Sequence, residues 1–148
     1  MAVFGENRKA RFDFEILEKF QGGLVLQGSE VKSIRLGRIQ LAGSFVGLKK
    51  GELWLIGSTI PPYQPNNTPS FYNQKRDRKL LVQKRELATL IGKIKERGLT
   101  LVPLSVYSTA AGRMKLEFAV GRSKKKWDKR EMLKKRETDR EIQRVMRG

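Results

Sequence analysis

Alternating apolar and polar residues predict a series of short strands along the first 120 residues. In the clearest run, every second residue from Met114 to Val120 is apolar, which is the pattern of a strand with one buried face. Similar runs predict further strands at residues 12–16, 24–26, 44–48, 52–56 and 99–107. Turn residues between successive runs, at 22–23, 49–51 and 110–112, predict three hairpins. The same alternation predicts a core position for five aromatic residues: Phe12, Phe14, Phe45, Trp54 and Phe118.

Two segments change to helical spacing. Residues 29–37 begin with Ser29, a good N-cap residue, and end at Gly37. Apolar residues at 87, 90, 91 and 94 predict a second helix that ends before Gly98. Residues 61–74 are rich in Pro, Asn, Ser and Tyr without periodicity, which predicts a long and mobile surface loop. Short hairpin strands with two helices predict an α+β fold that is mainly β: a small antiparallel OB-like β-barrel with flanking helices, because closure removes exposed strand edges.

The last 28 residues differ from the rest of the chain. Residues 121–148 contain 12 Lys or Arg and 5 Asp or Glu, with too few apolar residues to build a core. We therefore divide the chain into a barrel domain at residues 1–120 and a basic C-terminal tail at residues 121–148. Asp128 and Glu131 have the spacing of a capping box, so we expect the tail to be disordered when free and helical when bound. Trp127 has no core to enter and could stack on an unpaired base.

Charge and composition favour a nucleic acid as the partner. The formal net charge is +17, and the apolar stripe of the tail is too thin for a membrane-binding helix. No apolar run reaches the length of a membrane span, and no signal peptide is recognisable. The chain has no Cys and no His, which removes the usual general base, the common nucleophile pairs and most metal ligand sets. We expect no catalytic residue, no metal site and no cofactor.

Basic residues of the barrel domain are candidate phosphate contacts. Lys32 and Arg35 lie three positions apart on the first predicted helix, so they share a face. Arg76, Arg78 and Lys79 cluster before the second helix. Any one surface Lys or Arg is weak evidence, because such residues are usually only solvated. The acidic residues Glu30 and Glu86 fall in first helical turns, where negative charge stabilises the helix, so they do not indicate catalysis.

Several motifs, in order along the chain, together resemble the SsrA-binding protein (small protein B) family. They are the residues of segments 7–11, 28–35, 51–55, 78–87 and 98–104, and Asp128-Lys129-Arg130. The resemblance implies a cytoplasmic bacterial protein, expected to be a monomer, that binds the tRNA-like domain of transfer-messenger RNA. It also implies delivery of that RNA, with elongation factor Tu, to stalled ribosomes for trans-translation. The tail would then occupy the decoding centre, against small-subunit rRNA, and the empty mRNA channel.

The resemblance also implies which residues contact RNA. Asn7, Leu81 and Lys115 fall where the family's RNA-binding residues lie. Gln21 stands where an acidic residue is frequent, and Ser123 where a glycine is usual between barrel and tail. Together with the basic candidates, the expected RNA-binding set is Asn7, Arg8, Arg11, Gln21, Lys32, Arg35, Arg78, Lys79, Leu81 and Lys115. The expected ribosome-binding tail residues are Lys124, Lys125, Lys126, Trp127, Asp128, Lys129 and Arg130.

Two other functions stay open on the sequence. A basic OB-like protein could reside permanently on ribosomal RNA without any delivery role. An enzyme acting on RNA would instead need a carboxylate cluster and a divalent metal.

Overall fold

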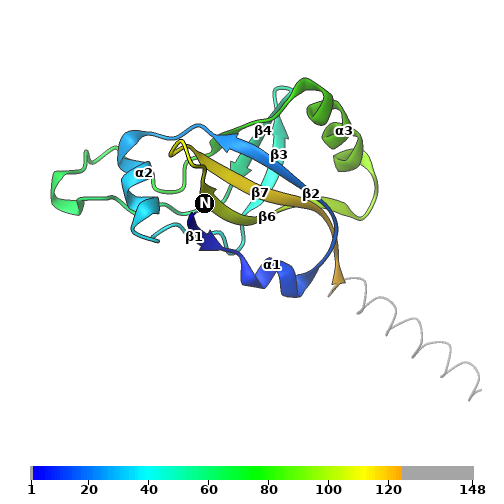
Figure 1. Ribbon diagram of the computed structural model, residues 1–148, viewed down its shortest axis with the longest axis horizontal. Coiled ribbons are helices and arrows are strands. Elements are labelled where there is room, and N and C mark those ends of the chain that lie inside the picture. Colours follow the sequence, from blue (N-terminus) through cyan, green and yellow to red (C-terminus); the bar gives the residue numbers. More distant parts are fainter. Residues whose placement is uncertain (1, 125–148) are drawn as a thin grey trace, which may run out of the picture.

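The computed structural model describes residues 2–124, which contain seven strands and three α-helices. Residue 1 and residues 125–148 lie outside this description. The elements in chain order (Figure 1) are β1 Ala2–Glu6, α1 Arg8–Asp13, β2 Phe14–Leu24, α2 Gly28–Arg35, β3 Phe45–Lys49, β4 Glu52–Ile56, a 3-10 turn Pro65–Asn67, β5 Arg78–Leu81, α3 Lys84–Lys95, β6 Leu99–Ser108 and β7 Met114–Ser123.

The strands of the described chain form one antiparallel sheet that closes on itself. The order is β1-β6-β3-β4-β5-β2-β7, and β7 also pairs with β6, so six strands form a ring with β1 outside it. β3 and β6 have the shortest pairing in the ring, which consists of Val46 opposite Leu101. This closed ring with flanking helices confirms the predicted α+β, OB-like architecture, and closure leaves few exposed strand edges.

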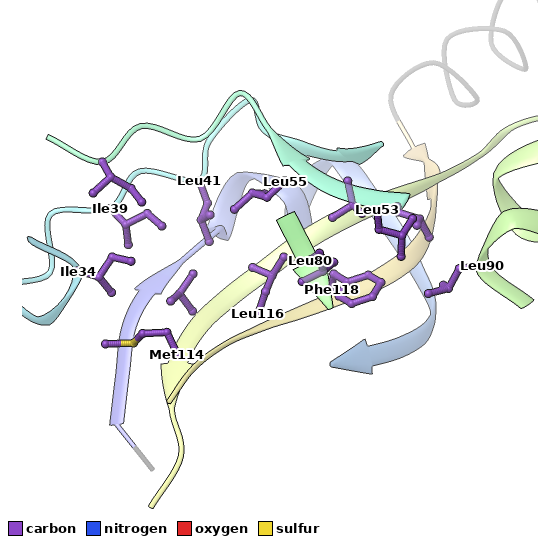
Figure 2. Close-up of a cluster of buried hydrophobic side chains, with 14 of the residues drawn as sticks. Ile34, Ile39, Leu41, Leu53, Leu55, Leu80, Leu90, Met114, Leu116 and Phe118 are labelled. Carbon is purple, nitrogen blue, oxygen red and sulfur yellow. The ribbon is translucent and has the colours of Figure 1, made fainter. Parts of the chain in front are cut away.

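The core fills the interior of the ring (Figure 2). Strand residues such as Leu53, Leu55, Leu116 and Phe118 are at most 1% exposed. Ile34 of α2 lies at one end of this cluster and Leu90 of α3 at the other, so the two helices cover opposite ends of the ring. Burial of this apolar area drives folding and fixes which face of each strand points outward.

The predicted first hairpin is wrong. Residues 14–24 form the single long strand β2, and Gly22 and Gly23 lie within it rather than at a turn. A Cβ on Gly22 would lie 2.7 Å from Leu80 Cδ1 and 3.1 Å from the Leu81 carbonyl oxygen. Glycine at this position therefore allows β2 to approach β5 closely, which the sequence alone could not distinguish from a turn signal.

The N-terminal segment forms a strand and a helix, although residues 1–11 show no periodic pattern from which either could be predicted. β1 pairs with β6 from Ala2 to Glu6, and α1 follows directly. Phe12 belongs to α1 and is 72% exposed, and Phe45 on β3 is 46% exposed. The core assignment was thus wrong for these two residues, whereas Phe118 is fully buried and stacks on Phe20 at a centroid distance of 5.9 Å. Phe14 and Trp54 are partly buried.

The other predicted elements are confirmed with small shifts. α2 begins at Gly28, and its N-cap is Gln27, two positions before the predicted N-cap Ser29. The hairpins β3–β4 and β6–β7 and the helix α3 match their predicted segments. β7 extends to Ser123, which pairs with Phe14 of β2, so the sheet continues three residues past Val120. No helix within residues 2–124 is long and apolar enough to cross a membrane.

Candidate nucleic-acid interface

Strand register places one row of side chains on the outer side of the sheet. Leu81 of β5 pairs with Gly23 of β2, Gly23 with Lys115 of β7, Lys115 with Tyr107 of β6, and Tyr107 with Val3 of β1. Residues directly opposite on paired strands point to the same side of a sheet. The adjacent residues Leu80 and Leu116 point into the core, so this outer row faces away from it.

The outer row combines apolar surface with a cation. Leu81 is 52% exposed and Val3 is 56% exposed, an unusual degree for large apolar side chains on a sheet. Lys115 lies between them on β7 and is partly buried. Its neighbour Gly23 on β2 has no side chain to cover the sheet at this point. A surface of this kind offers van der Waals contact to a ribose or base and one charge to a phosphate.

A second row adjoins the first and adds polar groups. Gln21 pairs with Glu117, and Glu117 pairs with Ser105. The Tyr107 hydroxyl crosses between the rows and donates a hydrogen bond to Gln21 Oε1 at 2.6 Å. Burial, with the Glu117 charge adding to it, raises the pKa of Tyr107, so the hydroxyl stays protonated and able to donate. This bond leaves the amide nitrogen of Gln21 free to serve as a donor to a ligand.

Helix α1 brings two arginines to this face. The Arg11 guanidinium lies 3.6 Å from a Glu117 carboxylate oxygen, which ties α1 to the second row. Arg8 is 91% exposed and lies 4.0 Å from Glu6. Exposed ion pairs of this length contribute little stability, so both guanidinium groups can exchange these carboxylates for phosphates. Of the predicted RNA-binding set, the structure therefore brings together Arg8, Arg11, Gln21, Leu81 and Lys115.

Lys79 extends the same outer side along β5. It lies two positions before Leu81 on the strand, so both side chains leave the sheet on one side. Its ammonium group is 3.1 Å from Glu52 of β4.

Lys32 and Arg35 are exposed but lie on α2, apart from the outer row. The Lys32 ammonium stands 5.6 Å from the Tyr63 ring centroid. A Cβ on Gly112, in the β6–β7 turn, would lie 3.7 Å from the Arg35 guanidinium. The two cations thus face different neighbours despite their helical spacing.

Arg78 is not an RNA contact, which corrects the prediction. Its side chain is fully buried and donates from Nε to Glu30 Oε2 at 2.9 Å and from Nη1 to the Ser58 carbonyl oxygen at 3.1 Å. Arg76 also binds Glu30, so this carboxylate bridges two guanidinium groups. Although burial alone would raise it, the pKa of Glu30 is lowered by hydrogen bonds from Arg76, the Gln27 N–H and Arg78. The sequence pattern of β5 could have indicated this burial, because strand alternation places Arg78 on the same face as the buried Leu80.

Asn7 is likewise structural in this fold. Its side chain is 3% exposed, accepts a hydrogen bond from the Ala10 N–H at 3.1 Å and donates to the Pro103 carbonyl oxygen at 2.9 Å. It therefore caps α1 and fixes that helix to β6. Asn7 thereby fixes the helix that carries Arg8 and Arg11.

Sequence reasoning missed Tyr107 and Glu117. Both take their position from register across the β6–β7 hairpin, where Tyr107 pairs with Lys115 and Glu117 with Ser105. Counting outward from the predicted turn at 110–112 would have paired Tyr107 with Lys115, so the hairpin itself carried that signal.

Lys124 is exposed directly after β7. The other predicted tail residues, Lys125, Lys126, Trp127, Asp128, Lys129 and Arg130, lie outside the described part of the chain. Within residues 2–124, no group of three or more Asp or Glu side chains is placed to hold a metal ion.

Comparison with known proteins identifies the family. Residues 4–148 match the family model described as SmpB protein. The SsrA-binding protein of Carboxydothermus hydrogenoformans is 48% identical over 146 residues, covering 99% of this chain and 97% of the relative. The SsrA-binding protein of Brucella anthropi is 48% identical over 145 residues, covering 98% and 91%.

A solved structure supports the same relationship. A chain in the structure named "tmRNA-SmpB: a journey to the center of the bacterial ribosome" matches with a TM-score of 0.67 and 44% identity, over 80% of this chain and 82% of that chain. The sequence matches over nearly the entire chain, and the fold matches over 80% of it. The chain belongs to the SmpB family of SsrA-binding proteins.

Proposed function

We propose that this protein binds the tRNA-like domain of transfer-messenger RNA and acts in trans-translation, the rescue of stalled ribosomes with tagging of incomplete peptides. The observation that carries the proposal is the outer row, where the exposed Leu81 and the half-buried Lys115 are aligned across the sheet of a basic protein, and the buried Tyr107 positions Gln21 beside them. The SmpB relatives and the tmRNA-SmpB structure support the choice of RNA. The same family assignment marks the protein as an RNA-binding protein and not an enzyme.

The rigid sheet would recognise a folded RNA by shape and backbone contacts. Phosphate contacts from Arg8, Arg11, Lys79 and Lys115 position an RNA but carry little sequence information. Leu81 and the Gln21 amide supply the closer contacts to sugar or base. Since folded RNA presents its backbone and 2′-hydroxyls on its surface, a rigid outer sheet with cations at its margins suits it.

Three finer features belong to the proposal. The protein works as a cytoplasmic monomer that delivers the RNA together with elongation factor Tu. Its basic tail, including Lys124 to Arg130, orders only when it enters the decoding centre and mRNA channel of the ribosome. There Trp127 stacks on rRNA, and the tail substitutes for codon–anticodon pairing that the RNA cannot supply.

The test is binding to the tRNA-like domain in the presence of excess ordinary tRNA at near-physiological salt. Retained binding supports the cognate RNA. Full competition by tRNA means that charge alone drives association, and a permanent ribosomal protein becomes the better explanation.

Substitution of Lys115 localises the interface. Lys115→Ala should weaken binding to the tRNA-like domain and reduce the slope of log K against log salt by about one. Lys95→Ala removes the same charge at the exposed end of α3 and serves as the matched control. Equal losses in both variants would contradict a specific role for the outer row.

A further inference from the structure

A cavity of about 520 Å³ lies between the 61–74 loop and the first turns of α2. Figure 1 shows this loop projecting beyond α2 at the end of the molecule opposite to the end of β7. The residues of the outer row do not line this cavity. A ligand in it would therefore occupy a separate site.

Aromatic side chains line the cavity. Tyr63, Phe71 and Tyr72 all contribute to its wall, and Phe71 is 87% exposed. An aromatic ring that is so exposed stabilises the fold little through burial, but it can supply a stacking surface to a planar ligand. Tyr72 differs, because its hydroxyl donates to the Ile60 carbonyl oxygen at 2.7 Å and anchors the loop.

The cavity wall is also positively charged. The Lys32 ammonium stands over the Tyr63 ring at 5.6 Å from the centroid, beside the cavity. Arg76 also lines the cavity and shares one carboxylate, Glu30, with the buried Arg78, which leaves an excess positive charge. Residues 61–74 contain no charged residue, so no acid in the loop offsets these cations. A low-dielectric wall with uncompensated cations favours an anion.

Hydrogen bonds hold the cavity open in one shape. Ser33 Oγ donates to the Pro61 carbonyl oxygen at 2.7 Å, and the Ile60 N–H donates to the Gln74 carbonyl oxygen at 2.9 Å, so both ends of the loop are attached to the body. Within the loop, Thr68 Oγ1 donates to the Gln64 carbonyl oxygen at 2.6 Å. A site formed in advance binds its ligand with less ordering cost.

We propose that this cavity binds one unpaired nucleotide of an RNA strand. The base stacks on Phe71 and Tyr63, and the phosphate binds Lys32. Asn67 and Asn73 also line the cavity, and Asn67 Oδ1 and Asn73 Nδ2 are left for the base edge, because Asn67 Nδ2 donates to Gln64 Oε1 and Asn73 Oδ1 accepts from the Lys75 N–H. Proteins commonly bind single-stranded nucleic acid by stacking bases on aromatic side chains next to a cation. Side-chain amides can both donate hydrogen bonds to a base and accept them from it. The proposal goes beyond binding of a folded RNA on the outer row, and it stands or falls independently of it.

The experiment uses the full-length protein and mononucleotides as probes. Adenosine 5′-monophosphate and uridine 5′-monophosphate are titrated while amide NMR shifts are followed, with adenosine and inorganic phosphate as separate arms. Saturable shifts at Gly28, Ser29, Asn67 and Thr68 are expected from the nucleotides, with weaker binding of adenosine or phosphate alone. Phe71→Ala and Lys32→Ala should each weaken nucleotide binding at least about fivefold, while both variants keep the native amide spectrum elsewhere.

Lys95→Ala provides the charge-matched control and should leave nucleotide affinity unchanged. The proposal is overturned if shifts spread over the whole basic surface, if they fail to saturate, or if Lys95→Ala weakens binding as much as Lys32→Ala. Phosphate alone binding as tightly as the nucleotides would also overturn it, since the aromatic wall would then contribute nothing.

Discussion

Glu30 has a structural role that differs from the one its position in the sequence predicts. In the sequence it occupies the first turn of a helix, where an acid is ordinary. In the fold it is fully buried and accepts hydrogen bonds from Arg76, Arg78 and the Gln27 N–H. It thereby joins α2 to β5 and to the segment before it. Only the tertiary structure brings residues 30 and 78 together, so strand alternation could indicate that Arg78 is buried but not that its partner is Glu30.

Replacement of Glu30 by Gln should destabilise the protein strongly. The substitution leaves the buried Arg78 guanidinium without a counter-charge, and loss of one partner from a buried ion pair costs about 3 to 5 kcal/mol. Urea unfolding at neutral pH measures the difference. Glu18→Gln, at an exposed position of β2, is the control and should change stability by less than about 0.5 kcal/mol. Similar small effects in both variants would mean that the cluster contributes little.

The same cluster predicts a pH dependence. Because the pKa of Glu30 is lower in the folded state than its ordinary value of 4.5, its contribution is fully present above pH 4.5. It is lost as the pH falls through the folded-state pKa, when the carboxylate takes up a proton. The free energy of unfolding should therefore fall on acidification below pH 4.5, and less steeply in Glu30→Gln. Urea titrations of both proteins across that range give the comparison, and parallel curves would exclude Glu30 as the cause.

At the scale of elements, β2 depends on close approach to its neighbours. It pairs with β7 over most of its length and with β5 at its C-terminal end. Gly22 has space for no Cβ, because Leu80 Cδ1 lies 2.7 Å from where one would be. The glycine is therefore a packing requirement of the ring at the β2–β5 junction, next to the exposed Leu81 of the outer row.

Two glycine substitutions should have opposite effects on stability. Gly22→Ala forces Leu80 or the strand to move, at a cost of about 1 to 3 kcal/mol. Gly92→Ala lies in α3 with nothing within 4 Å of the added Cβ, and it should stabilise the protein by about 0.5 to 1 kcal/mol through helix propensity. Thermal unfolding of both variants measures the pair. Stabilisation by Gly22→Ala would contradict the close packing of β2 on β5.

Elements with a clean local pattern were predicted well. In α3 and in the hairpins β3–β4 and β6–β7, apolar residues recur with a regular period, and turn residues join the two strands of each hairpin. β1, α1, β5 and the full length of β2 were missed. β1 is held by pairing with β6, whose sequence lies about 100 residues away, and α1 is capped by Asn7 and held against β6. Contacts between distant segments leave no local period to read.

At the scale of the molecule, we expect the folded part (residues 2–124) and the rest of the tail (residues 125–148) to carry out different steps of the proposed function. β7 pairs through Ser123, so truncation after Lys124 preserves the whole sheet, whereas removal from Gly121 would cut into it. That truncation removes ten basic and five acidic residues and leaves a strongly basic body. It should keep binding to the tRNA-like domain and lose peptide tagging on stalled ribosomes. A truncated protein that still supports tagging would refute the role assigned to the tail.

Salt dependence follows from the charge of the entire molecule. Each phosphate neutralised by Lys or Arg contributes roughly 0.9 to the log–log slope on a duplex, so several contacts on the body predict a steep loss of affinity with salt. Trp127→Ala keeps all charges and should leave that slope unchanged for free RNA, while it weakens association with stalled ribosomes. Equal losses for free RNA and for ribosomes would count against stacking of Trp127 on rRNA.

Local sequence features were enough to indicate the class of partner and most of the architecture. A charge of +17 indicated nucleic acid, the absence of Cys and His argued against catalysis, and the period of apolar residues predicted a small antiparallel barrel. Only folding sets which candidates are exposed. Ring closure and strand register align Leu81 and Lys115 on one face, while burial withdraws Asn7 and Arg78 into the protein. Charge and period are properties of neighbouring residues, whereas exposure and alignment depend on segments that meet only after folding.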